Sequence, residues 1–365
     1  PPTPPPHNPP PTPPRPPHHK HTHIPPPTSP INHTPHTTKI INIQQDPLEN
    51  PYTHHYRDLP KATGRVMEDL MYRHLDHWVD SYTHIFITYY SESGISDGRD
   101  IMEGEPWAAP LSPWGGMEPI AWSPDSKTIA YTSKKKTGME YSVSTNSDIY
   151  LYNIEDGSSL NLTEGMMGFD RGPLLSPDGT LIAWESMERD GYESDKNRLF
   201  TYDFVNDKKV YQTRDLDQDA HSMAWNSDGT GIYFTSDWHG TVEIYKLDLP
   251  AGQINKLTDG IHNYRSVAIA GDMLIATRQS MSMPTEIFAV NPQNGESKQI
   301  SEINNNILEQ LTMGQVEKRW IKTTDNKDML VWYIYPPHFD PEKKYPTLLY
   351  CQGGPQSMVS QFWSY

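Results

Sequence analysis

Two short segments contain residues whose types and spacing could do chemistry. The first is Gln352, Gly353 and Gly354, which follow an apolar run and precede a proline. Because glycine has no Cβ, its backbone N–H group can come close to a ligand. Such N–H groups stabilise the oxyanion that develops during acyl transfer. The structural alternative is an ordinary turn at the end of a strand.

The second segment is charged and contains Glu188, Arg189 and Glu193, between Trp184 and Leu199. A carboxylate that is partly shielded from water attracts a cationic group more strongly than an exposed carboxylate does. The segment could therefore bind a positively charged ligand. The alternative is that it forms the solvated tip of a hairpin, which is the usual fate of such charged runs.

The composition excludes several classes of protein. The chain has 30 basic and 46 acidic residues, and its net charge is -16. A nucleic-acid-binding protein needs a basic face for phosphates, so we expect no nucleic-acid partner. Cys351 is the only cysteine, which excludes an intrachain disulfide and a cysteine-based zinc site. The sequence contains no run of about 18 apolar residues, so no membrane contact is predicted.

Residues 1–60 differ from the rest of the chain. They contain 20 of the 35 prolines and 9 of the 16 histidines. They lack apolar periodicity and cannot build a core. We expect residues 1–60 to be a disordered Pro/His/Thr-rich segment, either a natural linker or an artefact.

From about residue 117 onward, one pattern recurs. Turn-forming runs start at Ser123, Ser176 and Asn226, which are 53 and 50 residues apart, and an apolar run follows each of them. A second set of apolar and aromatic runs lies at residues 148–152, 198–202, 243–247 and 286–290. A repeat of this length is typical of solenoids and propellers.

Each repeat predicts four antiparallel strands. The runs are rich in strand-forming residues that alternate at period two, and the Pro-Asp-Gly and Asp-Gly sequences favour hairpin turns. Four such strands make one propeller blade, and blades must stack to bury their faces. We expect the recurring aromatic residues to pack between blades rather than to form a ligand cage; they are Trp122, Trp184, Trp225, Tyr131, Tyr150 and Phe234.

The fold class predicted from these repeats is all-β. Residues 61–314 are predicted to form an incomplete β-propeller with about four clear blades and a partial one. The partial blade is expected within residues 66–101. A closed propeller commonly needs more blades, so either early blades are missing or the ring is open.

The pattern changes after residue 315. Residues 315–323 and 329–335 predict two strands joined by a turn, and residues 347–351 predict a short buried strand that runs into the Gly-Gly loop. A continuous apolar strand of this kind is typical of an α/β sheet. We interpret residues 315–365 as the first strands of an α/β-hydrolase domain, truncated.

Together these features resemble the prolyl oligopeptidase family. The resemblance is carried by blades with Ser-Pro-Asp-Gly turns, the Tyr-Pro-Pro sequence at residues 335–337, the Tyr-Pro pair at 345–346 and the Gly-Gly-Pro loop at 353–355. Residues 184–196 are similar to the branch of bacterial dipeptidyl peptidase V and the acylaminoacyl peptidases.

The resemblance implies a serine exopeptidase that releases dipeptides or acylated residues from peptide amino termini. The propeller would gate access, and neither a metal nor an organic cofactor is expected. One oxyanion-hole donor would come from the loop of Gln352 and Gly353, most directly from Gly354 N–H, although the family often has His or Tyr at the position of Gln352. The acidic segment at residues 188–193 would hold the substrate's ammonium group.

The family places its G-x-S-x-G nucleophile elbow well beyond the Gly-Gly-Pro loop. The chain as given is therefore predicted to lack the catalytic triad and to be inactive by itself. By its branch, we expect a periplasmic or secreted protein, with a cytoplasmic location as the alternative. The oligomeric state stays open.

Two other functions are known for propellers of this kind. A non-enzymatic TolB-like propeller would bind a protein partner, but it has no reason to end with the sequence of residues 345–355. A carbohydrate-active propeller would need two carboxylates about 5–10 Å apart around its channel, and the sequence marks no such pair.

Overall fold

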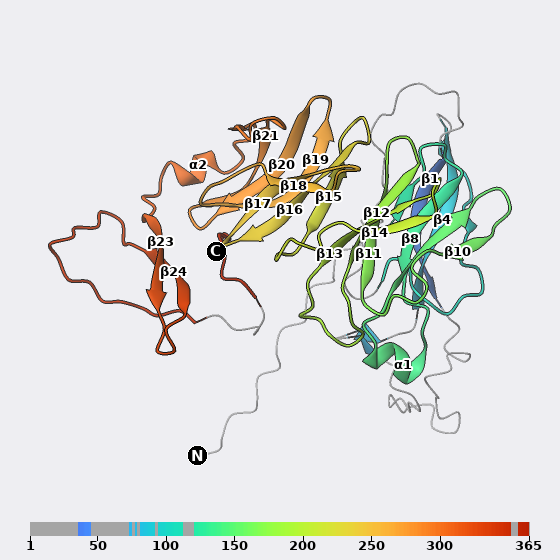
Figure 1. Ribbon diagram of the computed structural model, residues 1–365, viewed down its shortest axis with the longest axis horizontal. Coiled ribbons are helices and arrows are strands. Elements are labelled where there is room, and N and C mark those ends of the chain that lie inside the picture. The colour runs from blue at the N-terminus through green and yellow to red at the C-terminus, as the bar shows by residue number, and fades with distance from the viewer. Residues whose placement is uncertain are drawn as a thin grey trace, which may run out of the picture.

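The computed structural model describes residues 36–44, 73–74, 77–78, 81–91, 94–111, 120–351 and 357–364. Small sheets stand side by side in chain order, from β1 and β4 on one side to β19, β20 and β21 on the other (Figure 1). The predicted all-β propeller is confirmed.

Within the described residues, four blades of four antiparallel strands make up the body, and each blade follows the order of the chain. The strands of blades 1 and 2 are β7 (Ile120–Trp122), β8 (Thr128–Ser133), β9 (Asp148–Asn153), β10 (Ser159–Asn161), β11 (Asp170–Leu175), β12 (Leu181–Ser186), β13 (Arg198–Asp203) and β14 (Lys208–Tyr211). Those of blades 3 and 4 are β15 (His221–Trp225), β16 (Gly231–Trp238), β17 (Thr241–Asp248), β18 (Gln253–Lys256), β19 (Asn263–Ala270), β20 (Met273–Ser280), β21 (Met283–Val290) and β22 (Ser297–Gln299).

A partial blade precedes blade 1. Its β4 (Ser81–Ser91) pairs with both β1 (His36–Gln44) and β6 (Arg99–Asp100), and the end of β4 pairs with β5 (Gly94–Ile95). A separate ribbon consists of β2 (Arg73–His74) and β3 (His77–Trp78).

The expectation of disorder over residues 1–60 is wrong for residues 36–44, which form β1. The run Lys-Ile-Ile-Asn-Ile at residues 39–43 is rich in β-branched residues, which favour strands. The surrounding Pro/His/Thr composition obscured that local preference.

The turn between the first and second strands of each blade is built as its sequence requires. In blade 2 the Ser176 hydroxyl donates to Asp178 at 2.6 Å and accepts the N–H of Leu181 at 2.9 Å. Gly179 has a φ of +73°, a conformation that favours glycine. These hydrogen bonds take the place of the strand-to-strand hydrogen bonds that cannot form within a tight turn. They therefore fix the register of the hairpin.

The hydrophobic core lies between blades rather than in one centre. The partial blade packs on blade 1, and each blade then packs on the next. Trp184 and Phe234 are fully buried, as expected for packing between blades, and Trp122 packs against its cluster while partly buried. Stacking of this kind leaves the ends of the strands at the surface, where the turns lie.

The C-terminal part follows α2 (Asn305–Leu308). The predicted hairpin is confirmed as β23 (Val316–Lys322) and β24 (Asp328–Ile334). The buried strand predicted at residues 347–351 is wrong: these residues form no strand, and Leu348 is 96% exposed. A strand in a parallel sheet needs neighbours for its N–H and C=O groups, and no strand among the described residues pairs with this run.

Candidate functional site

One face of the propeller carries all the turns between second and third strands, and we call it the turn face. Antiparallel strand order places these turns, and the links that lead to the next blade, at the same ends of the strands. Bridges from Ser147 to Phe169 and from Val242 to Asn263 hold neighbouring blades in the same orientation. The helix α1 (Gly138–Val143), between β8 and β9, marks this end of blade 1 in Figure 1.

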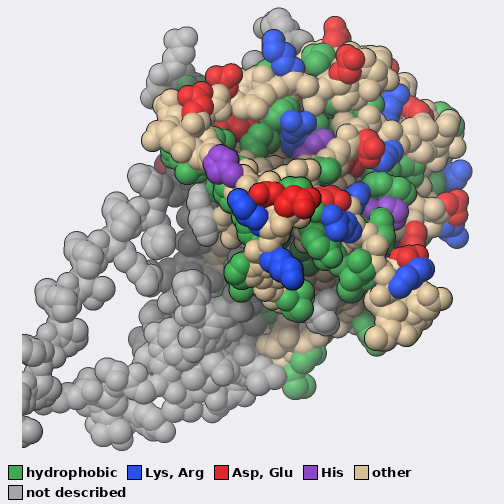
Figure 2. Space-filling model, turned by 90° about the vertical axis from the view of Figure 1, so that its left-hand side faces the viewer, with side chains coloured by type: hydrophobic (Ala, Val, Ile, Leu, Met, Phe, Trp, Pro, Cys, Tyr) green, Lys and Arg blue, Asp and Glu red, His purple; other side chains and the backbone are tan. Residues whose placement is uncertain are grey.

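The C-terminal residues rest on the turn face. The N–H of Gly240, in the β16–β17 turn, donates to Met358 at 3.2 Å, and the Asn263 side chain donates to Ser360 at 2.8 Å. Figure 2 shows the side of the molecule with β23 and β24, where apolar side chains lie exposed among charged ones. The exposed apolar residues of this hairpin are Trp320, Ile321, Met329, Tyr333 and Ile334.

The turn between β12 and β13, residues 187–197, is also on this face, and we call it the acidic loop. Arg189 forms an ion pair with Asp195 through its guanidinium and donates its backbone N–H to the same carboxylate at 2.8 Å. The guanidinium also lies 3.9 Å from the centre of the Tyr192 ring. Arg189 is therefore engaged inside the loop, where it shapes the turn.

The two other predicted residues of this loop point their charge to solvent. Glu188 is 70% exposed, and one of its oxygens lies 3.8 Å from the guanidinium of Arg198. Glu193 is exposed as well. Two carboxylates thus stand on a turn at the same face as the C-terminal segment, in positions that a cationic group can reach.

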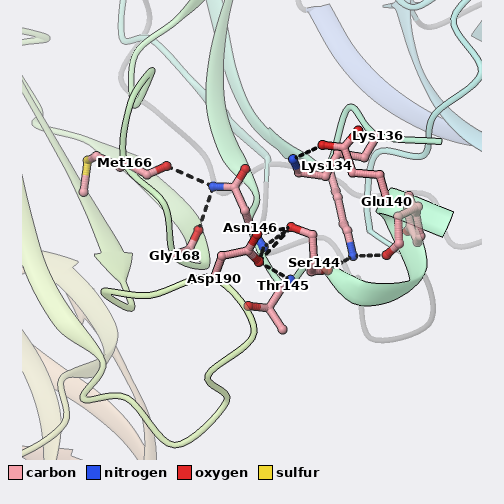
Figure 3. A network of polar contacts seen from close by, with 10 residues as sticks. Lys134, Lys136, Glu140, Ser144, Thr145, Asn146, Met166, Gly168 and Asp190 are labelled. Atoms are coloured by element: carbon pink, nitrogen blue, oxygen red, sulfur yellow. Dashed lines mark hydrogen bonds and ion pairs between the residues drawn. The ribbon is translucent and has the colours of Figure 1, made fainter. Parts of the chain in front are cut away.

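Asp190 fastens the acidic loop to blade 1. Its carboxylate accepts the Ser144 hydroxyl at 2.8 Å and the backbone N–H groups of Thr145 at 2.7 Å and Asn146 at 3.2 Å (Figure 3). Burial disfavours the charged carboxylate, but these hydrogen bonds outweigh burial and lower the pKa of Asp190. The amide of Asn146 continues the network to the carbonyls of Met166 and Gly168 in the link to blade 2.

A cavity of about 700 Å³ opens beside the acidic loop on the turn face. The Asn197 N–H at the end of the loop donates to Asp219 in the cavity wall at 2.5 Å. Burial raises the pKa of Asp237, another wall residue. The lining residues are Leu216, Asp217, Gln218, Asp219, Asp237, Trp238, His239, Tyr245 and Lys256.

Beneath the acidic loop, Glu185 joins blades 2 and 3. Its buried carboxylate accepts the side chains of Arg171 at 3.1 Å and Asn197 at 2.7 Å, and the backbone N–H of Ser222 at 3.2 Å. Burial would raise the pKa of Glu185, but the adjacent His221 and the charge of Arg171 lower it overall. Burial likewise opposes a charge on His221, yet Glu185 raises the pKa of that histidine.

The predicted oxyanion loop, Gln352, Gly353 and Gly354, lies outside the described residues. No helix in the described part of the chain is long and apolar enough to cross a membrane. In the same part of the chain, no three metal-ligating side chains of His, Cys, Asp or Glu come together.

One G-x-S-x-G sequence, from Gly94 through Ser96 to Gly98, was missed by sequence reasoning. A nucleophile elbow leads from a strand into a helix, whereas this serine lies between the short strands β5 and β6. The Ser96 hydroxyl accepts the N–H of Tyr89 at 3.0 Å and donates to the Asp97 carbonyl at 3.2 Å. Ser96 therefore belongs to a surface turn.

Stacked four-stranded blades with an acidic, hollowed turn face define a propeller domain. The TolB beta propeller domain family matches residues 116–310, which is 195 of the 365 residues, so the chain belongs to that family.

Two relatives indicate the family more narrowly than the propeller domain does. Dipeptidyl-peptidase 5 of Porphyromonas gingivalis is 49% identical over 310 residues, covering 85% of this chain and 45% of the relative. Its counterpart in Porphyromonas endodontalis is 44% identical over 308 residues, covering 84% and 45%. The prediction of a prolyl oligopeptidase-family propeller region is confirmed, and the chain spans less than half the length of these relatives.

A solved structure supports the fold. The acylaminoacyl peptidase of Pyrococcus horikoshii superposes with a TM-score of 0.64 at 16% sequence identity, over 90% of this chain and 46% of that chain. At this identity the likeness shows a shared fold.

Proposed function

We propose that this chain is the gating part of a serine exopeptidase that removes dipeptides or acylated residues from peptide amino termini. The observation that carries the proposal is the pair of open carboxylates, Glu188 and Glu193, on a loop whose last residue, Asn197, bonds to the wall of a cavity on the face that meets the C-terminal segment. An ammonium group at the start of a peptide has the charge and size that such carboxylates bind. The names of the relatives support the same reaction class.

The remaining assignments complete this proposal. Gln352, Gly353 and Gly354 form the oxyanion loop, with Gly354 N–H as the donor, in a hydrolase domain that begins near residue 315. We place the catalytic triad in the part of the complete protein that corresponds to the rest of the relatives' length. Residues 61–314 form the gate, and the protein acts in the periplasm or is secreted. The non-enzymatic TolB-like alternative has less support, because the relatives are named as peptidases.

The test uses the complete gene product and matched substrates. A chromogenic dipeptide amide with a free amino terminus and its acetylated twin are compared, with the 365-residue chain as the inactive control. Faster cleavage of the free substrate indicates dipeptidyl release, and faster cleavage of the acetylated one indicates acylaminoacyl release. Cleavage of neither would refute the proposal.

The role of the acidic loop is tested separately. Replacing Glu188 by Gln removes the charge while keeping the shape, so KM for the free substrate should rise about tenfold, as expected when a charged hydrogen bond is lost. KM for the acetylated twin, which has no ammonium group, should not change. Equal changes for both substrates would rule out recognition of an amino terminus by this carboxylate.

A further inference from the structure

In every blade, a Ser or Thr that follows the fourth strand has its hydroxyl hydrogen-bonded to the third strand. In blades 1, 3 and 4 it donates to an acid in the third strand that lies 15 residues earlier in the sequence. The same hydroxyl accepts the N–H of the residue that follows the acid. We call this arrangement the hydroxyl clip, and its pairs are Thr163 with Asp148, Thr258 with Glu243, and Ser301 with Glu286.

Blade 2 departs from this pattern at one residue. Thr213 occupies the equivalent place and accepts the N–H of Leu199 at 3.0 Å, as its counterparts do. The residue before Leu199, however, is Arg198, where the other three blades have Asp or Glu. The blade therefore folds without the acid, and the clip itself does not account for an arginine at this position.

The guanidinium of Arg198 instead holds the beginning of the acidic loop. Its Nε donates to the Ser186 carbonyl at 3.2 Å, and one terminal nitrogen donates to the Met187 carbonyl at 2.7 Å. Its other terminal nitrogen lies 3.8 Å from Glu188. The side chain is only 13% exposed and lies near the Phe200 ring. The planar guanidinium of arginine holds several N–H donors in fixed directions, so it can bond to these acceptors together. The ammonium group of a lysine does not offer this geometry.

We propose that Arg198 is a positioning residue for substrate recognition. By fixing the backbone at Ser186 and Met187, and by attracting one oxygen of Glu188, it presents the free side of that carboxylate at the turn face. The group to be bound is the ammonium at the amino terminus of a peptide. This inference rests on the proposed function and adds the residue that sets the geometry of its binding site.

The experiment restores the pattern of the other blades in the complete gene product. Arg198→Glu installs the acid that can accept the Thr213 hydroxyl, so the variant should fold. The control is Arg214→Glu, which makes the same change of charge at an exposed position of the same blade. Steady-state kinetics on the free and acetylated substrates are then measured for each variant, alone and combined with Glu188→Gln.

For Arg198→Glu we expect KM for the free substrate to rise about tenfold while kcat stays within about twofold, the signature of lost ground-state binding. In the Glu188→Gln background the same replacement should add little, because the two residues act through one contact. An equal increase in both backgrounds, or an unchanged KM, overturns the inference. If Arg198→Glu does not fold, Arg198→Lys takes its place in the same cycle, with a rise in KM of about threefold expected because lysine lacks the fork.

A second measurement separates this inference from the proposed function. Backbone amides of residues 187–190 should exchange hydrogen faster in the 365-residue chain with Arg198→Glu, and at the wild-type rate with Arg214→Glu. If the complete wild-type protein cleaves neither substrate, the proposed function fails, and the inference fails with it. If the wild-type protein is active but Arg198→Glu behaves as wild type in both assays, the positioning role alone is wrong.

Discussion

Glu185 provides the sharpest test of how the blades are held together. The carboxylate is buried and joins Arg171 and Asn197 of blade 2 to Ser222 of blade 3. In Glu185→Gln the side chain keeps its shape, but its amide presents N–H donors toward the donors of Arg171 and Asn197. The guanidinium also loses its counter-charge.

The size of the effect follows from burial. Removing one partner of a buried charge pair costs about 3–5 kcal/mol of stability. Because the Arg171 side chain is 40% exposed, water solvates part of the orphaned charge, and we expect a loss of about 2–4 kcal/mol. The matched control is Glu155→Gln, whose pair with Lys127 is exposed on both sides, and we expect it to cost less than about 1 kcal/mol.

Urea unfolding followed by tryptophan fluorescence measures both variants. The reasoning is refuted if Glu185→Gln unfolds within about 0.5 kcal/mol of the wild-type protein, the usual scatter of surface substitutions. It is also refuted if the loss equals that of Glu155→Gln. Either result would mean that packing between blades, and not this carboxylate, determines the stability of the interface.

The remaining predictions concern pH and two other residues. Glu185 has a lowered pKa, so its stabilisation is present above its ordinary value of 4.5 and is lost as the pH falls through the folded-state pKa. His221 has a raised pKa, so its stabilisation is complete below 6.5 and is lost as the pH rises through its folded-state value. The cost of Glu185→Gln should therefore peak between these values; urea midpoints across pH that leave it constant would contradict this. Asp190→Asn should lower stability by about 1–3 kcal/mol and speed amide exchange at residues 144–146, whereas unchanged exchange would contradict the anchoring of the acidic loop by Asp190. Ser96→Ala should leave peptidase activity of the complete protein unchanged, and loss of activity with the fold intact would reinstate Ser96 as a nucleophile.

The blades were predictable because their signals are local. Strand-forming runs and Ser-Pro-Asp-Gly turns fix each hairpin by backbone chemistry, and Gly179 in its positive-φ turn needs no distant partner. The strand predicted at residues 347–351 failed for the opposite reason. An apolar run becomes a buried strand only when other strands pair with it. The sequence of the run does not show whether such strands are present.

The sequence predicted which segment carries the candidate site, but not how the side chains of that segment are arranged. Charge spacing indicated Glu188, Arg189 and Glu193, yet it could not show that Arg189 would pair with Asp195 while the two glutamates stay open. The anchoring of the loop to blade 1 through Asp190 joins residues 44 to 46 positions apart. Contacts of that range depend on how blades stack, which a search for motifs does not reveal.

The hydroxyl clip shows a signal that the sequence did contain. A hydroxyl residue lies 15 positions after the start of the third-strand run in every blade, so aligning the four repeats by this spacing singles out Arg198 without any structure. The apolar residues do not show this signal, because they build the core, whereas the clips are made by polar residues in the first half of the third strand. In a propeller the core residues must repeat for blades to stack, so a departure from the repeat at a polar position points to what one blade does that its neighbours do not.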